Sequence, residues 1–199
     1  MHNVRSVVEC TLACCLFAAT AAHGQAAGQT SQTTPTPAKP AKPAVGTLMT
    51  PAETYGKLLN GVEQEFVSAA EAMPEDKYDF APTQGEFKGV RTFGEQVKHV
   101  AESNTFFFHD ATKPLVDNRA DFEKLKTKAE IVAALKDSLK LAHEYVGGIT
   151  AQNAFVMTPN GTRGGMAALG ISHMMDHYGQ MVVYLRMNGI VPPASRAGM

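Results

Sequence analysis

The chain has 199 residues, enough for one domain with extensions but too few for two domains of ordinary size. Its formal net charge is −1, from 18 basic and 19 acidic side chains, so the composition gives no sign of a basic surface for nucleic acid. The chain has no Trp, and nothing in it resembles an aromatic platform for stacking bases. All three cysteines, Cys10, Cys14 and Cys15, lie near the N-terminus. If this segment is removed, the mature protein has neither a disulfide framework nor a cysteine nucleophile.

Residues 1–24 have the composition of a secretory signal peptide. Small and apolar residues dominate positions 7–22, Arg5 precedes them, and two alanines lie shortly before Gly24. We therefore expect cleavage near Gly24 and a periplasmic or secreted protein, with no stable membrane insertion after processing. Two alternatives are weaker. A lipoprotein would carry its modified cysteine after the apolar run, whereas Cys14 and Cys15 lie inside it, and an uncleaved anchor would need about twenty apolar residues to span a bilayer.

Residues 25–48 form a linker of low complexity. Gln, Thr, Pro, Ala and Lys predominate in it, and it contains repeated Thr-Pro and Lys-Pro pairs. Such a composition offers too little apolar surface to offset the entropy that is lost on ordering. We expect a disordered, extended tether here, followed by a folded domain over residues 49–195.

Three helix starts share one signature, a Thr that is followed three residues later by a Glu. In this capping box the Thr hydroxyl accepts from the backbone amide of the Glu, and the carboxylate accepts from the backbone amide of the Thr. Pro51, at the first helical position, strengthens the first start. The three pairs are Thr50 and Glu53, Thr92 and Glu95, and Thr127 and Glu130.

Four apolar-periodic segments predict helices over residues 51–73, 93–107, 128–147 and 164–188. Three of them have clear stop signals, because Pro74 follows the first, Gly147 and Gly148 close the third, and Gly189 follows the fourth. The first helix has the longest apolar stripe, which consists of Tyr55, Leu58, Leu59, Val62, Phe66, Ala69, Ala70 and Met73.

These segments predict an all-α fold. No segment alternates apolar and polar residues for long, so we expect strands to be absent or minor. Four helices of roughly twenty residues around one core are typical of a four-helix bundle. The inter-helix connections at residues 74–91 and 148–163 are long, and residues 113–126 have room for a short helical turn. Long connections allow arrangements other than up-and-down, and the sequence does not choose among them.

The fourth helix carries two histidines, His173 and His177, at a spacing that places both on one face. Neutral imidazoles presented in this way suit zinc, nickel, copper or iron, and a third imidazole from another helix would complete a site with room for water. Gln180, Tyr184 and Asn188 continue the stripe, which is too polar for an ordinary core, since each such group buried without a partner costs about 1–3 kcal/mol. The alternative is that the histidines are exposed or satisfied by ordinary hydrogen bonds.

Other interpretations of this helix fit less well. A zinc protease needs Glu directly after the first histidine, where this chain has Met174. Asp176 falls off the histidine stripe and is expected to be a solvated charge. The helix is rich in methionine, as a copper(I) site would be, but its methionines do not share one face and are expected to fill the core. Elsewhere, His109 and His143 have no comparable companions and are expected at the surface.

His99 lies on the second predicted helix, on the flank of its apolar stripe and beside Gln96 and Ser103. A single histidine in such a position is more often structural than a metal ligand. From the residues alone, both interpretations of His99 stay open.

The domain resembles the DinB-like (DinB/YfiT-type) family of metal-binding four-helix-bundle proteins, over about residues 50–195. Four pieces carry the resemblance in order: residues 73–83, 92–101, 173–180 and 184–193. The family has one metal-binding histidine on its second helix and a pair four residues apart on its last, so the resemblance implies that His99, His173 and His177 are metal ligands. It also implies a divalent ion, nickel or zinc, with water completing the coordination, and a homodimer. It does not imply DNA binding.

Three functions follow from these expectations. The first is an exported metal-dependent hydrolase or transferase that acts on an unknown small molecule, with a general base from Glu95, Glu102 or the long loops. The second is a thiol-dependent S-transferase, because characterised relatives use the metal to activate low-molecular-weight thiols. Export counts against this function, since reduced thiols are scarce outside the cytoplasm. The third is a non-enzymatic protein that binds metal or a small ligand. The sequence identifies no catalytic residue.

Overall fold

The structure is a computed structural model, and it describes residues 42–196. The expected signal peptide (1–24) and most of the expected linker (25–48) lie outside these residues. Residues 45–196 belong to one compact unit, and the description below concerns this unit. Within the described residues, no helix combines the length and apolar character that crossing a membrane requires.

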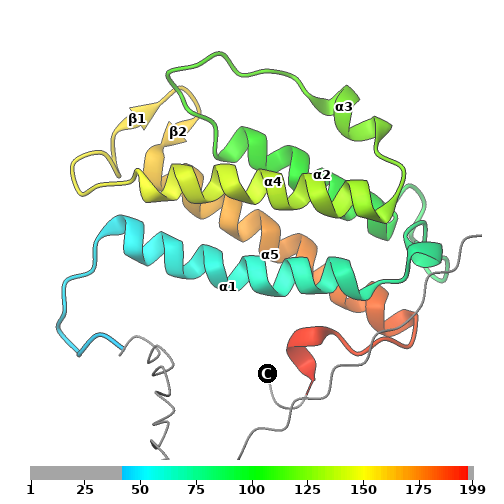
Figure 1. Cartoon of the computed structure of the whole chain (residues 1–199). Helices are drawn as coiled ribbons and strands as arrows, with labels where there is room; N and C mark the ends of the chain where they lie inside the picture. The colour runs from blue at the N-terminus through cyan, green and yellow to red at the C-terminus, as the bar shows by residue number, and fades with distance from the viewer. Residues whose placement is uncertain (1–41, 197–199) are drawn as a thin grey trace, which may run out of the picture. The chain divides into compact units, whose positions relative to one another are not determined.

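Four long helices make up most of the unit, which confirms the all-α prediction (Figure 1). They begin and end within two residues of the predicted limits: α1 (Pro51–Ala72), α2 (Phe93–Phe107), α4 (Lys128–Gly147) and α5 (Arg163–Met187). The expected turn between the second and third of these is a short helix, α3 (Arg119–Lys124). Two single-turn 3₁₀ helices, Glu75–Lys77 and Pro193–Ser195, complete the helical elements.

The strand content of the described residues is one small hairpin. Its strands, β1 (Met157–Thr158) and β2 (Gly161–Thr162), pair antiparallel, with Met157 opposite Thr162 and Thr158 opposite Gly161. The hairpin leads directly into α5, because Thr162 is also the N-cap of that helix and its hydroxyl accepts from the amide of Gly165 at 3.1 Å.

Three of the long helices begin at the predicted capping residues. Thr50, Thr92 and Thr127 are the N-caps of α1, α2 and α4, and both hydrogen bonds of the capping box are present in each. After α5, Gly189 adopts a left-handed backbone conformation with φ of 73°, which glycine favours and which ends the helix.

The four long helices pack so that α1 and α2 each lie against both α4 and α5. In Figure 1, α1 and α5 run in one direction, and α2 and α4 run in the other. The segment 108–127, which carries α3, therefore returns along the length of the molecule before α4 begins. As a result α2 and α5 are antiparallel neighbours, and the middle of one faces the middle of the other.

The core lies between these helices and consists mainly of the predicted stripes. On α1, however, Leu58 was expected in the core and is 53% exposed, whereas Leu59 is fully buried. Adjacent residues are rotated by about 100° around a helix, so only one of the two can point fully into the core. Four polar side chains are buried among the apolar ones: Gln96, Asn104, Ser138 and His177.

Candidate metal centre

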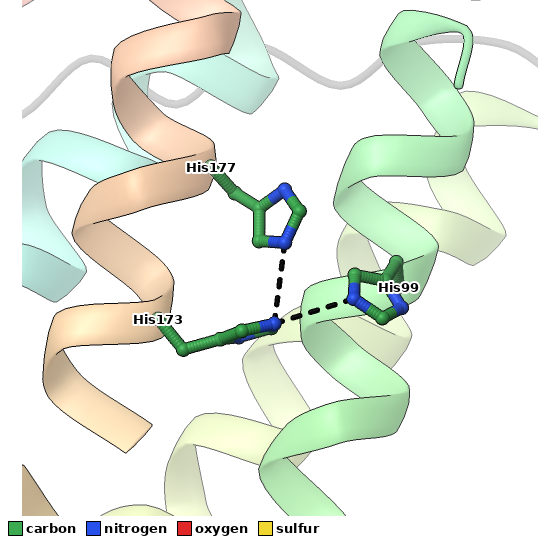
Figure 2. Close-up of side chains that lie close together, drawn as sticks. All are labelled: His99, His173 and His177. Carbon is green, nitrogen blue, oxygen red and sulfur yellow. Dashed lines mark hydrogen bonds between the residues drawn. The ribbon is translucent and has the colours of Figure 1, made fainter. Parts of the chain in front are cut away.

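Three imidazole rings converge between α2 and α5. His99 comes from the middle of α2, and His173 and His177 come from successive turns of α5. The Nε2 atom of His173 lies 3.2 Å from Nε2 of His99 and 3.2 Å from Nε2 of His177. Figure 2 shows the rings directed toward one another from the two helices. The structure therefore brings together all three histidines named from the sequence.

The spacing of these nitrogens fits a single metal ion. A metal–nitrogen bond of about 2.0–2.1 Å and an angle between octahedral and tetrahedral place two ligand nitrogens about 2.8–3.4 Å apart. The observed contacts of 3.2 Å fall within this range, and the three ligand atoms lie within 4.8 Å of one another. Two lone pairs at such a distance repel unless a proton or a cation lies between them. The three histidines can thus hold a metal ion.

Close packing of α5 against the end of α2 sets this geometry. Gly170, one turn before His173, is buried, and a Cβ atom there would lie 2.9 Å from Cβ of Phe107 and 2.6 Å from Cζ of Phe108. The missing side chain lets the two helices approach. The ring of Phe107 then packs against the ring of His173, with 5.1 Å between ring centroids.

Two glutamines extend the site on the side of His177. The Oε1 atom of Gln96 lies 2.6 Å from Nδ1 of His177, and Nε2 of Gln96 donates to Oε1 of Gln180 at 2.8 Å. Gln96 is 1% exposed and His177 is 5% exposed. Gln180 was predicted on the histidine stripe, whereas Gln96 was given no role, because its partner Gln180 lies 84 residues away in the sequence.

Burial keeps the rings uncharged. It lowers the pKa of His99 to about 4, with smaller effects from the positive charges of Arg91 and His173. Burial is also the main reason why the pKa of His177 falls to about 4 and that of His173 lies below its usual range. All three rings are therefore neutral bases at pH 7, the form in which imidazole binds metal.

Two cavities border the histidines. The larger, of about 540 Å³, includes His99 and His173 in its lining and has an apolar wall on α2 and the segment after it. That wall consists of four side chains: Phe106, Phe107, Leu115 and Val116. The smaller, of about 370 Å³, borders His99 but not His173 and is lined mostly by charged side chains: Arg91, Glu95, Lys98, Glu102, Arg119 and Glu123.

The two glutamates considered as general bases differ in their surroundings. The carboxylate of Glu95 closes the capping box of α2, where it accepts from the backbone amide of Thr92 at 2.8 Å. Glu102, one turn after His99 on the same helix, lines both cavities. Of the two glutamates, only Glu102 lines the cavity that borders both His99 and His173.

The remaining residues named from the sequence lie away from the three rings. Asp176 is exposed, as expected, and accepts a long hydrogen bond of 3.4 Å from Gln180. His109 is half-buried and its Nε2 lies 2.7 Å from the backbone oxygen of Lys113. His143 was expected at the surface and is half-buried; its Nε2 lies 2.5 Å from a carboxylate oxygen of Glu63 on α1, so it joins α4 to α1.

Of the five methionines of α5, three are core residues as expected and two are not. Met166, Met174 and Met181 are buried, whereas Met175 and Met187 are 40% and 49% exposed. They do not gather on the face that carries His173 and His177.

Comparison with known proteins agrees with the resemblance inferred from the motifs. A family model described as the DinB superfamily matches residues 58–181, and this range includes all three histidines. No curated protein matches the chain. Because the family match covers more than half of the chain, the protein belongs to the DinB superfamily.

Proposed function

We propose that this DinB-superfamily protein is an exported, metal-dependent hydrolase or transferase that acts on a small molecule. His99, His173 and His177 would bind one divalent ion, nickel or zinc, through their Nε2 atoms. The fold would be the four-helix bundle expected from the sequence, and the pairwise packing of α1 and α2 against α4 and α5 supports that description.

The observation that carries the proposal is the convergence of three neutral, inward-facing imidazoles. Their Nε2 contacts of 3.2 Å match the spacing of ligands around one ion. Their nitrogen donors suit nickel and zinc. With only three protein ligands, the coordination shell keeps room for water or substrate.

An ion bound there would act as a Lewis acid and lower the pKa of a water or thiol group beside it. The chain's own residues would do the rest. The cavity of about 540 Å³ borders His99 and His173, and its apolar wall would exclude water from a substrate's apolar part. The carboxylate of Glu102 would accept the proton released by the attacking group, since it lies on the lining of both cavities.

The test of the metal centre is metal analysis and zinc or nickel titration of the purified chain and of three variants, His99→Ala, His173→Ala and His177→Ala. We expect one ion per chain in the wild type and a large loss of affinity in each variant. His143→Ala is the matched control, because it removes a paired histidine outside the site and should leave metal content unchanged. Wild-type protein that stays metal-free after loading would contradict the proposal.

The test of the chemistry is a panel of ester, amide and thiol-conjugation substrates on the metallated chain. Hydrolysis or transfer without added thiol, lost in Glu102→Gln while the metal is retained, is the expected result. Turnover only with a low-molecular-weight thiol would point to the thiol-dependent S-transferase instead. Absence of turnover across the panel would favour the non-enzymatic binding protein.

Export is proposed from the sequence of residues 1–24. The small apolar run after Arg5 and the two alanines before Gly24 support it. Mass spectrometry of the N-terminus of protein recovered outside the cytoplasm tests it. We expect a mature chain that begins near Gly24 or Gln25, and an intact N-terminus in the cytoplasmic fraction would contradict export.

A further inference from the structure

We propose that Gln96 is a positioning residue that selects the metal-binding tautomer of His177. It would do so because its own amide is held by Gln180, so that only its oxygen faces the ring. The consequence for metal affinity rests on the metal centre proposed above, whereas the consequence for the tautomer does not.

The first step is the orientation of the Gln96 amide. Its Nε2 donates to Oε1 of Gln180 at 2.8 Å, so the NH₂ end of the amide is directed away from His177. Its Oε1 then lies 2.6 Å from Nδ1 of His177. Gln96 is only 1% exposed, so solvent offers little compensation for the opposite orientation.

The second step is the position of the proton on the ring. An amide oxygen accepts hydrogen bonds and cannot donate, so the short contact requires a proton on Nδ1 of His177. In a neutral imidazole the other nitrogen then carries the free lone pair. That nitrogen is Nε2, the atom that faces His173 at 3.2 Å.

The third step is what the reverse orientation would do. A flipped Gln96 amide would direct its NH₂ group at Nδ1, and the ring would keep its proton on Nε2. A protonated Nε2 cannot bind a metal ion. Gln180 therefore matters through Gln96, and Asp176 lies one step farther out, as the acceptor of a 3.4 Å contact from Gln180.

His173, on the same helix as His177, has no such support. Nδ1 of His173 is buried and has no hydrogen-bond partner among the described residues. The two rings on α5 are thus held differently, the ring of His177 by a hydrogen bond and the ring of His173 by packing against Phe107.

The direct test measures the tautomer of His177 by ¹⁵N NMR of the metal-free chain near pH 7.5. We expect the proton on Nδ1 in the wild type and a shift of the population toward Nε2 in Gln96→Leu. Gln96→Glu keeps an acceptor oxygen and should restore the Nδ1 proton. An unchanged His177 tautomer in Gln96→Leu would overturn the proposal.

The second test measures the zinc affinity of the same chains by competition with a chromophoric chelator. Loss of a group that orients a metal-binding histidine typically lowers affinity by about 10–100-fold, and we expect this for Gln96→Leu but not for Gln96→Glu. Gln180→Leu should give a smaller loss, because it frees the Gln96 amide to turn.

The control is Asn104→Leu. Asn104 is a fully buried amide two turns farther along α2, and it donates to Ser138 rather than to a histidine. Its loss should lower stability while leaving the His177 tautomer and the zinc affinity unchanged. If Asn104→Leu lowers zinc affinity as much as Gln96→Leu does, the loss in Gln96→Leu is due to general destabilisation and the proposal is contradicted. A wild-type chain with the expected tautomer that binds neither zinc nor nickel would instead contradict the metal centre.

Discussion

At the scale of single residues, burial and hydrogen bonding make His177 a ready ligand. Its ring is 5% exposed, its Nδ1 has an acceptor, and burial lowers its pKa to about 4. At neutral pH protons do not compete for the lone pair on Nε2 of a buried imidazole of this kind, so the lone pair is free to bind a metal ion.

This leads to a prediction about acid. Protons and metal compete for the same lone pairs, so metal affinity falls only where the free rings become protonated. With the pKa of His99 and His177 near 4, affinity should change little between pH 7 and pH 5 and fall steeply toward pH 4. Competition titrations across this range check it. Loss of affinity already near pH 6.5, the ordinary histidine pKa, would show that the rings are solvated.

In the metal-free chain the same lowered pKa values act on stability. Unfolded histidines take up protons near pH 6.5, whereas the folded ones do so near pH 4. The unfolded state therefore binds more protons between these values, and the free energy of unfolding should decrease as pH falls from about 6.5 to about 4. Urea unfolding of the apo chain at several pH values measures this. A His177→Leu variant should show a shallower decrease, and an identical slope would contradict the assignment.

The residues of the site differ in how well the sequence predicts their role. Helix periodicity alone pairs His173 with His177, because both lie on one element. It leaves His99 ambiguous, since a position on the flank of one helix says nothing about which helix it faces. Gln96 is missed because its partner Gln180 lies 84 residues away, and only the packing of α2 against α5 brings the two together.

At the scale of helices, local signals were enough to place the starts. The capping boxes at Thr50, Thr92 and Thr127 involve residues only three apart, so sequence spacing determines them. The burial of Leu58 was misjudged for the opposite reason. How wide an arc of α1 is covered depends on its neighbours, and the α1 sequence does not contain that information.

The close approach of α5 to α2 gives a prediction for Gly170. Gly170→Ala places a Cβ against Phe107 and Phe108, and we expect a loss of about 1–3 kcal/mol of stability, as is typical of overpacked cores. Because His173 lies one turn away, zinc affinity should fall as well. Denaturant unfolding and metal titration measure the two effects.

The matched control is Gly179→Ala on the same helix. Nothing lies within 4 Å of a Cβ built there, so the substitution should stabilise the helix by about 0.5–1 kcal/mol and leave zinc affinity unchanged. Equal effects of the two substitutions would contradict a role for close packing at Gly170.

At the scale of the whole molecule, the order of packing was beyond the sequence. The segment 108–127 is long enough to join helices in more than one arrangement, and its length does not say that it runs back along the molecule. The observed return makes α2 and α5 antiparallel neighbours. It also supplies Leu115 and Val116 to the wall of the larger cavity beside His173.

The domain limits give a prediction at this scale. A chain that lacks residues 1–48 should keep the melting temperature and zinc affinity of the chain that begins at residue 25, because residues 25–48 are expected to bury nothing. Removal of residues 1–50 also deletes the Thr50 cap and should lower stability by about 1 kcal/mol. A large loss of stability in the first truncation would contradict the proposed start of the domain at residue 49.

The metal centre is tested most directly by X-ray absorption spectroscopy of the zinc- or nickel-loaded chain. We expect a first shell with three imidazole nitrogens at about 2.0–2.1 Å, completed by oxygen ligands. It also predicts that this imidazole signal weakens in His99→Ala and stays unchanged in His143→Ala. A loaded chain whose spectrum shows an oxygen-only shell without imidazole scattering would contradict it.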